Sequence, residues 1–200
     1  MFEIVNEFEN AIADFFGAPC AVSTDCCTHA IELCLRYKKI KKTTVPNHTY
    51  LSIPLTLKKL DISFSFNREQ WTEYYKLSNT NIIDAATLWR QNSYIPGTLM
   101  CISFQYKKHL SLGRAGMILC DNVVDCANLL KMGYDGRHRN APWPEQKITS
   151  MGYHYYLTPE TAQLGLDKLP DAIQRTPKIW SWKDYPDISN NYIFKDIPVS

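Results

Sequence analysis

The chain has 200 residues, of which 45% are hydrophobic and 12% aromatic, so it can bury a sizeable core as one domain. Its 22 basic and 20 acidic residues give a net charge of +2, and its one basic run, at residues 38–42, is too short to indicate nucleic-acid binding. No apolar run approaches the ~18 residues of a membrane helix, and the acidic amino terminus does not look like a secretion signal. We therefore expect a globular protein without nucleic-acid or membrane partners.

The cysteine pattern points to a reducing compartment. The seven cysteines are an odd number, lie mostly in apolar segments, and include no Cys-x-x-Cys pair or zinc-spaced histidine tract. Because thiols stay reduced inside cells, this usage favours a cytoplasmic protein and predicts no metal site.

Apolar periodicity gives the order of the expected elements. A helix with apolar positions from Phe2 to Phe15 should stop at Gly17, which tolerates the left-handed conformation. Further helices are expected at residues 28–39, 51–59, 69–77, 123–132 and 158–169. Strands are expected at residues 18–23, 43–46, 62–66, 81–85, 99–104 and 116–120. Alternating strands and helices predict an α/β fold with a mostly parallel sheet.

The segment at residues 102–116 holds the first candidate site. An apolar strand ends at Ser103, Lys108 follows five positions later, and Gly113 and Gly116 precede the next apolar run. A basic loop between two buried strands is where an enzyme would keep a reactive amine, although such a loop is more often a solvated turn.

Two other junctions carry candidate chemistry. At residues 25–30 a strand gives way to a helix, whose free N–H groups and Thr28 hydroxyl would suit a phosphate, or Thr28 could be an ordinary helix cap. Asp84 ends an apolar strand, where the crevice of an open α/β sheet lies, and a buried carboxylate there needs a cationic partner; otherwise it caps the next turn.

Taken in order, these segments resemble motifs of the DegT/DnrJ/EryC1/StrS sugar aminotransferase family, fold-type I enzymes that use pyridoxal 5'-phosphate. Residues 103–116 are similar to the family's Ser-Phe-x-x-x-Lys-x-x-x-x-Gly-x-x-Gly pattern, which implies that Lys108 is the Schiff-base lysine. The neighbouring Lys107 is the rival, but it breaks the five-residue spacing from Ser103. The resemblance also implies a three-layer fold, a shortened version of the family's large domain.

The resemblance assigns the remaining cofactor contacts. Residues 27–35 look like the family's Gly-Thr-x-Ala phosphate segment, with Cys27 in place of glycine, and Ser103 also serves the phosphate. Asp84 would pair with the pyridine nitrogen, and Thr87 replaces the residue that usually contacts the ring hydroxyl. The implied cofactor-binding residues are Cys27, Thr28, His29, Tyr50, Asp84, Thr87, Ser103, Lys108 and His154, with Tyr50 stacked on the ring.

Residues 151–158 look like the family segment whose asparagine reaches the cofactor of the neighbouring subunit. Here His154 replaces that asparagine and Tyr156 replaces an arginine. Because relatives build each active site at a dimer interface, the resemblance implies a homodimer with shared active sites.

Length is the main departure from the family, whose members are nearly twice as long. Residues 67–80 leave room for only one crossover helix, so one strand–helix unit is expected to be missing. We expect a single domain over residues 1–200, with a tail rich in proline and aromatic residues at 170–200 in place of the small domain. The tail should pack on the body through Trp180, Trp182, Tyr185 and Tyr192.

The resemblance implies an aminotransferase that moves an amino group, from a donor such as glutamate, to a nucleotide-linked keto-sugar. Lys108 and Asp84 would be its catalytic residues. Two alternatives stay open: a dehydratase-like reaction, in which relatives carry histidine in place of the lysine and for which the adjacent His109 is notable, and a truncated homologue that binds cofactor or a partner without turnover.

Overall fold

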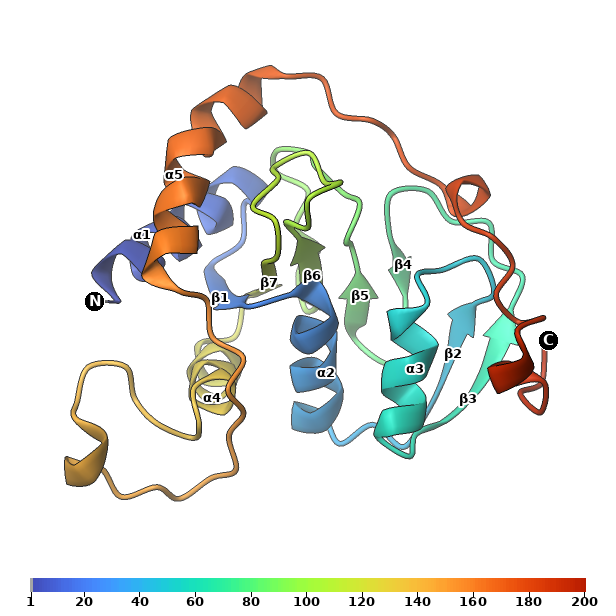
Figure 1. Ribbon diagram of the computed structural model, residues 1–200, viewed down its shortest axis with the longest axis horizontal. Coiled ribbons are helices and arrows are strands. Elements are labelled where there is room, and N and C mark those ends of the chain that lie inside the picture. Colours follow the sequence, from blue (N-terminus) through green and yellow to red (C-terminus); the bar gives the residue numbers. More distant parts are fainter. Residues whose placement is uncertain (1) are drawn as a thin grey trace.

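The computed structural model describes residues 2–200 and leaves Met1 outside (Figure 1). Its helices are α1 (Glu3–Phe16), α2 (Cys27–Tyr37), α3 (Ser52–Lys59), α4 (Val123–Gly133) and α5 (Pro159–Gln174). Its strands are β1 (Cys20–Thr24), β2 (Lys42–Pro46), β3 (Ser63–Asn67), β4 (Tyr75–Lys76), β5 (Ile82–Asp84), β6 (Leu99–Ser103) and β7 (Gly116–Cys120). Short 3-10 turns lie at Trp143–Glu145, Trp182–Asp184 and Tyr192–Phe194. Gly17 ends α1 with φ 73°, as its position predicts.

The main sheet is mixed, which corrects the expectation of a mostly parallel sheet. Its strand order is β1-β7-β6-β5-β4, and β7 is antiparallel to both of its neighbours, as β4 is to β5. Strands β1, β6 and β5 therefore run in one direction, while β7 and β4 oppose them. Strands β2 and β3 form a separate parallel pair.

Two connections explain this difference. Strands β6 and β7 are joined by a loop without a crossover helix, so they pair as a wide hairpin. The helix expected at residues 69–77 is absent from the described chain, and that expectation was wrong. The backbone of this segment instead pairs with other parts of the chain. Strand β4 pairs with β5. Glu73 N donates to Trp180 O at 2.8 Å, and Trp71 O accepts a hydrogen bond from Trp182 N at 3.1 Å.

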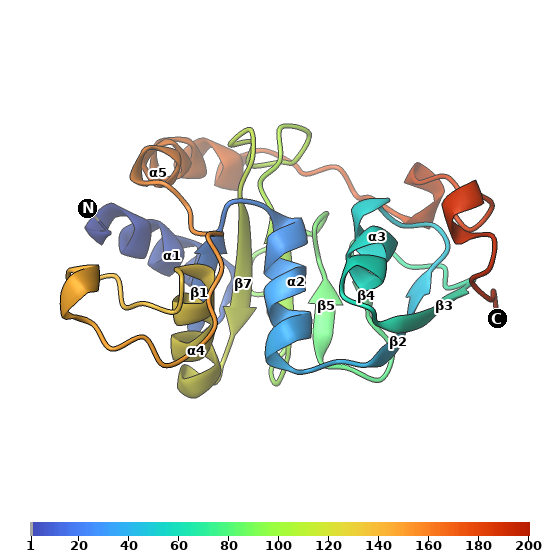
Figure 2. The same ribbon diagram turned by 60° about the horizontal axis from the view of Figure 1, so that its bottom comes forward.

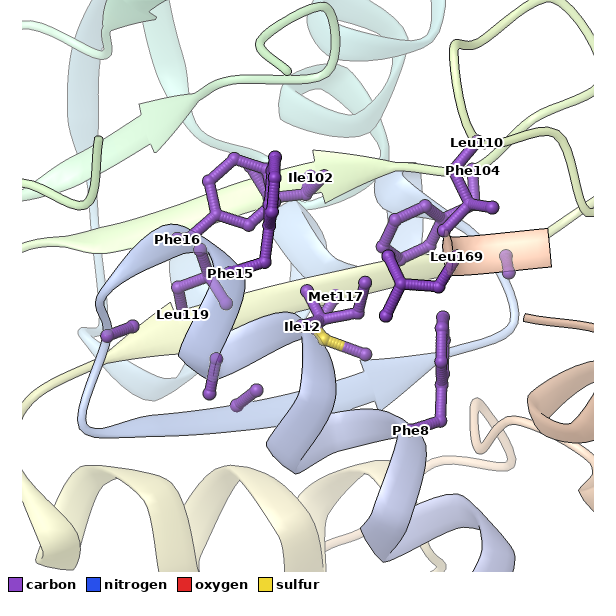
Figure 3. Packing of buried hydrophobic residues seen from close by; sticks show 14 of the residues in the cluster. Phe8, Ile12, Phe15, Phe16, Ile102, Phe104, Leu110, Met117, Leu119 and Leu169 are labelled. Carbon is purple, nitrogen blue, oxygen red and sulfur yellow. The ribbon is translucent and has the colours of Figure 1, made fainter. Parts of the chain in front are cut away.

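Alternate residues of the sheet enter two hydrophobic clusters. Met100 and Ile102 of β6 belong to the same cluster as Phe8, Ile12 and Phe16 of α1. Figure 3 shows Ile102 on the side of the sheet that carries these α1 residues. The intervening Leu99 and Cys101 instead join a cluster that includes Ile31, Leu33 and Leu35 of α2. Figure 2 shows α1 and α2 on either side of the strands. Because successive side chains point to opposite faces of the sheet, the strands pack against helices on both faces, and this packing holds the strand ends in place.

The carboxyl-terminal segment after α5 runs across the molecule to the β2–β3 pair (Figure 1). It is anchored there by the fully buried Phe194, whose ring centroid lies 5.6 Å from that of Phe66, and by a bridge between Phe66 and Val199. Tyr192, which the sequence suggested as an anchor, is 82% exposed. Within residues 2–200, no helix is both long and apolar enough to cross a membrane.

Candidate active site

A cavity of about 670 Å³ opens at the carboxyl ends of β5 and β6, beside the start of α2. Because β1, β5 and β6 run in the same direction, the residues that follow them meet at one edge of the sheet. Asp84 ends β5, Ser103 ends β6, and Cys27 begins α2 just after β1. The mixed sheet thus still brings these three positions to one cavity.

Lys108 enters the cavity from the β6–β7 loop. Its ammonium group lies 5.4 Å from the centre of the Trp180 ring. Burial lowers the pKa of Lys108 below its ordinary value, and the nearby Asp84 and Cys27 only partly oppose this effect. A lowered pKa makes the neutral, nucleophilic form of the amine easier to reach than it is for an exposed lysine.

Asp84 lies at the floor of the cavity, where it is only 6% exposed. Its Oδ2 accepts a hydrogen bond from the Tyr75 hydroxyl at 2.7 Å, and its Oδ1 accepts one from the Ala86 N–H at 3.0 Å. Thr49 in turn bonds the Tyr75 hydroxyl at 2.5 Å. Burial raises the pKa of Asp84, although these hydrogen bonds and the Lys108 charge favour its ionised form.

The start of α2 forms the third wall. A Cβ on Gly116 would lie 2.3 Å from Cys27 N, so glycine lets β7 approach the helix end closely. The hydroxyls of Thr28 and Ser52 lie 2.8 Å apart and both line the cavity. Arg114, also on its wall, donates to Asp25 at 2.9 Å. Hydroxyls, a helix N-terminus and a cation together suit an anion.

Eight of the nine predicted cofactor residues line this one cavity: Cys27, Thr28, His29, Tyr50, Asp84, Thr87, Ser103 and Lys108. Tyr50 is 59% exposed at its rim. The Thr87 hydroxyl donates to the Glu73 carbonyl at 2.6 Å and is thereby engaged with the backbone. His154 lies away from the cavity, 69% exposed, with Nδ1 at 3.1 Å from Asp135.

Sequence reasoning missed Ser52, Tyr75 and Arg114. Arg114 lies between the two motif glycines Gly113 and Gly116, and this position could have indicated a role in the site. Ser52 begins the helix that follows Tyr50, and this proximity was a second signal. Tyr75 was placed in a helix, so its contact with Asp84 could not be seen. Trp180 and Tyr185 of the tail also line the cavity, and nothing in their spacing indicates that.

The neighbours of Lys108 make other contacts. Lys107 reaches the cavity wall but is exposed, with its ammonium 5.6 Å from the Tyr106 ring centre. His109 is turned toward α5, where its Nε2 lies 2.8 Å from the Ala172 carbonyl oxygen. The loop thus directs one of three consecutive basic side chains toward Asp84.

Comparison with known proteins gives a match to one protein family over the first part of the chain. Residues 1–62 match the model of the DegT/DnrJ/EryC1/StrS aminotransferase family. A search of curated proteins finds no match to the sequence.

Solved structures share the fold over most of the chain. AtS13 from Actinomadura melliaura superposes with a TM-score of 0.74 at 17% identity, covering 86% of this chain and 61% of its own. A Bacillus cereus protein assigned to the PLP-dependent aminotransferases gives 0.75 at 14% identity, covering 98% and 81%. A DegT DnrJ EryC1 StrS aminotransferase from Brucella abortus gives 0.72 at 15% identity, covering 85% and 59%. The chain thus spans about three fifths of the length of two of these proteins.

The matching segment at residues 1–62 contains α1, β1, α2, β2 and α3, and the fold similarity to solved structures extends over most of the remaining chain. The first 62 residues are thus similar to the DegT/DnrJ/EryC1/StrS aminotransferase family, and the chain shares the fold of solved aminotransferase structures at 14–17% identity.

Proposed function

We propose that this protein is a pyridoxal phosphate-dependent aminotransferase that transfers an amino group, from a donor such as glutamate, to a nucleotide-linked keto-sugar. The observation that carries the proposal is the meeting of Lys108 and Asp84 in one cavity, with the pKa of the amine lowered by burial. Sugar aminotransferases among the structural neighbours support the substrate class. The free thiols of all seven cysteines are in keeping with a cytoplasmic protein.

The residues present fit pyridoxal phosphate. Asp84 is a buried carboxylate whose hydrogen-bond partners within residues 2–200 are the Tyr75 hydroxyl and the Ala86 N–H, so a protonated pyridine nitrogen would supply a cationic partner. The hydroxyls of Thr28, Ser52 and Ser103 and the start of α2 would hold the phosphate. Tyr50 would cover the ring, and a cavity of about 670 Å³ has room for a cofactor with part of a substrate.

When bound, pyridoxal phosphate supplies an electron sink for negative charge that develops on the substrate carbon. Asp84 keeps a proton on the ring nitrogen, because the ionised carboxylate favours the charged pyridine. Lys108 would hold the cofactor through its Nζ, and the same nitrogen would carry a proton between the substrate and the cofactor. Arg114 and His29 add positive charge beside the phosphate region.

The dehydratase-like alternative needs a histidine in the lysine position. His109 does not serve it, since its ring faces the Ala172 carbonyl of α5. Lys108 occupies the cavity instead, and this favours amino transfer.

A homodimer with shared sites belongs to the same proposal. Tyr50 and Tyr106 are 59% and 62% exposed beside the cavity, and the segment before α5 exposes Trp143 and Met151. Burying such aromatic and apolar surface against a second copy would also bring groups from that copy toward the cavity.

The test is a half-reaction followed by absorbance. After loading with pyridoxal phosphate, the protein should show a cofactor band near the visible range that glutamate bleaches, and a keto-sugar nucleotide should restore it. A protein that binds the cofactor but does not respond to any amino donor would be a binding homologue, contrary to the proposal.

A further inference from the structure

We propose that residues 178–186, here called the strap, form the subsite for the sugar ring that receives the amino group, with Trp180 as its stacking face and Tyr185 as its hydroxyl-reading residue. The inference rests on the proposed function and goes beyond it by assigning the part of the chain that recognises the substrate. Four strap residues line the cavity: Trp180, Asp184, Tyr185 and Pro186.

The strap is fixed to the body on both sides. Trp180 O accepts a hydrogen bond from Glu73 N at 2.8 Å, and His48 Nδ1 lies 2.7 Å from Tyr185 O. Asp184 bonds Ser181 N at 2.9 Å, closing a capping box on the short 3-10 turn. With its backbone held in this way, the strap forms a preorganised wall of the cavity.

The two aromatic residues reach the reacting region. The Trp180 ring centre is 5.4 Å from the Lys108 ammonium, so this ring lies beside the position that the aminated carbon must occupy. Tyr185 lines the same cavity as Asp84, and burial together with the charge of Asp84 raises the pKa of Tyr185. The ring held here is therefore the one that reacts, and the nucleotide would extend toward the open side.

The chemistry of the wall suits a sugar. Trp180 and Tyr185 have ring centres 6.2 Å apart with planes tilted by 46°, and Tyr185 also packs on Trp71 at 5.4 Å. These tilted rings offer separate aromatic faces to the C–H groups of a sugar ring, and the Lys178 ammonium lies over the Trp180 ring at 3.8 Å. Within the described residues, the Tyr185 hydroxyl has no hydrogen-bond partner, so it is free to donate to a sugar hydroxyl. Asp184 is already paired with Lys178 at 2.6 Å, which leaves the wall with little net charge.

The experiment is calorimetric titration of the cofactor-loaded protein with UDP-glucose and dTDP-glucose, each compared with the matching UDP or dTDP. The strap should make at least one nucleotide sugar bind more tightly than its nucleotide. Tyr185→Phe should reduce this preference about tenfold, the effect of one lost hydrogen bond to a sugar hydroxyl, and Trp180→Leu should abolish it. Affinity for the nucleotide alone should stay the same.

Tyr192→Phe is the matched control, because Tyr192 is a tail phenol that is 82% exposed and should leave the preference unchanged. Circular dichroism and thermal melting test whether each variant is folded. If Trp180→Leu does not fold, Trp180→Gln replaces it, because glutamine also lacks an aromatic face. Equal loss of nucleotide and nucleotide-sugar binding in the Trp180 variant would mean that the strap reads the base and would overturn the proposal.

A wild-type protein that shows no preference for sugar would also overturn it. The glutamate half-reaction separates the two claims, since bleaching by glutamate supports amino transfer whether or not the strap binds sugar. Absence of that bleaching, with sugar preference intact, would count against the proposed function alone.

Discussion

Asp84 shows how single residues set the chemistry of the cavity. A carboxylate at 6% exposure is costly unless hydrogen bonds or a cation stabilise it, and here one phenol and one backbone N–H do so. The carboxylate can accept further hydrogen bonds on the side of the cavity, which Lys108 also lines. The arrangement places a carboxylate where a pyridinium nitrogen could pair with it.

The first prediction removes that charge. Asp84→Asn keeps the shape and one acceptor oxygen, so the protein should fold and retain part of its cofactor affinity. Turnover should fall by at least ~100-fold, because the ring nitrogen is no longer held in its protonated form. Steady-state kinetics with cofactor-binding titration makes the comparison, and near-normal turnover would refute the role of Asp84.

The second prediction concerns His29 at the start of α2. Its Nδ1 lies 2.6 Å from Asp25, and although burial disfavours the charged ring, contacts with Asp25 and Cys26 raise the pKa of His29 from 6.5 to about 9. Since the folded pKa exceeds the unfolded one, this contribution to stability is complete below about pH 6.5 and disappears as the pH rises through about 9.

Urea unfolding from pH 6 to 10 measures this effect. Wild type should lose stability across that window relative to His29→Gln, which lacks the titrating ring. Parallel pH profiles of the two proteins, or an NMR pKa for His29 near 6.5, would show that the Asp25 contact does not hold the charged ring.

At the scale of elements, the third prediction tests the contact between β7 and α2. Gly116→Ala places a Cβ 2.3 Å from Cys27 N and 2.4 Å from Cys26 C, so the helix start must move. We expect a loss of ~1–3 kcal/mol in the free energy of unfolding and weaker binding of pyridoxal phosphate. Gly133→Ala is the control, since its Cβ would meet only Leu33 Cδ1 at 3.5 Å. Equal melting temperatures for both variants would contradict this packing.

Elements whose structure depends on local sequence could be predicted, and elements that depend on distant contacts could not. The periodic helix ending at Gly17 and the apolar strands β6 and β7 were predicted to within one or two residues. The apolar residues that each of them buries follow a regular pattern within the element's own sequence. Residues 69–77 were not predicted, since Glu73 takes φ 63° and its N–H bonds Trp180, far along the chain. Strand direction failed for a related reason, because apolar runs alone do not specify a partner.

The same limit applies to the site. Ser103, Lys108 and Asp84 could be found because each directly ends a strand or follows one in a recognisable motif. Tyr75 and Tyr185 could not, because only tertiary contacts bring them to the cavity. In the tail, Phe194 rather than Tyr192 is buried, and no periodicity in an irregular segment distinguishes the two.

At the scale of the whole molecule, the fourth prediction links assembly to the cofactor. His154 is 69% exposed and lies outside the cavity of its own chain, so it can serve a site only across an interface. Sedimentation should show a dimer at micromolar concentration, and His154→Ala should weaken cofactor retention several-fold with little change in melting temperature. A stable monomer that retains the cofactor fully would rule out shared sites.

The most direct test of the central claim is chemical mapping of the reactive amine. Borohydride reduction of the cofactor-loaded protein, followed by peptide mass spectrometry, should place the phosphopyridoxyl group on Lys108, whose amine is buried beside Asp84. Lys108→Ala should abolish the labelling, while Lys107→Ala should retain it. Labelling of Lys107, or none in the loaded wild-type protein, would contradict the assignment.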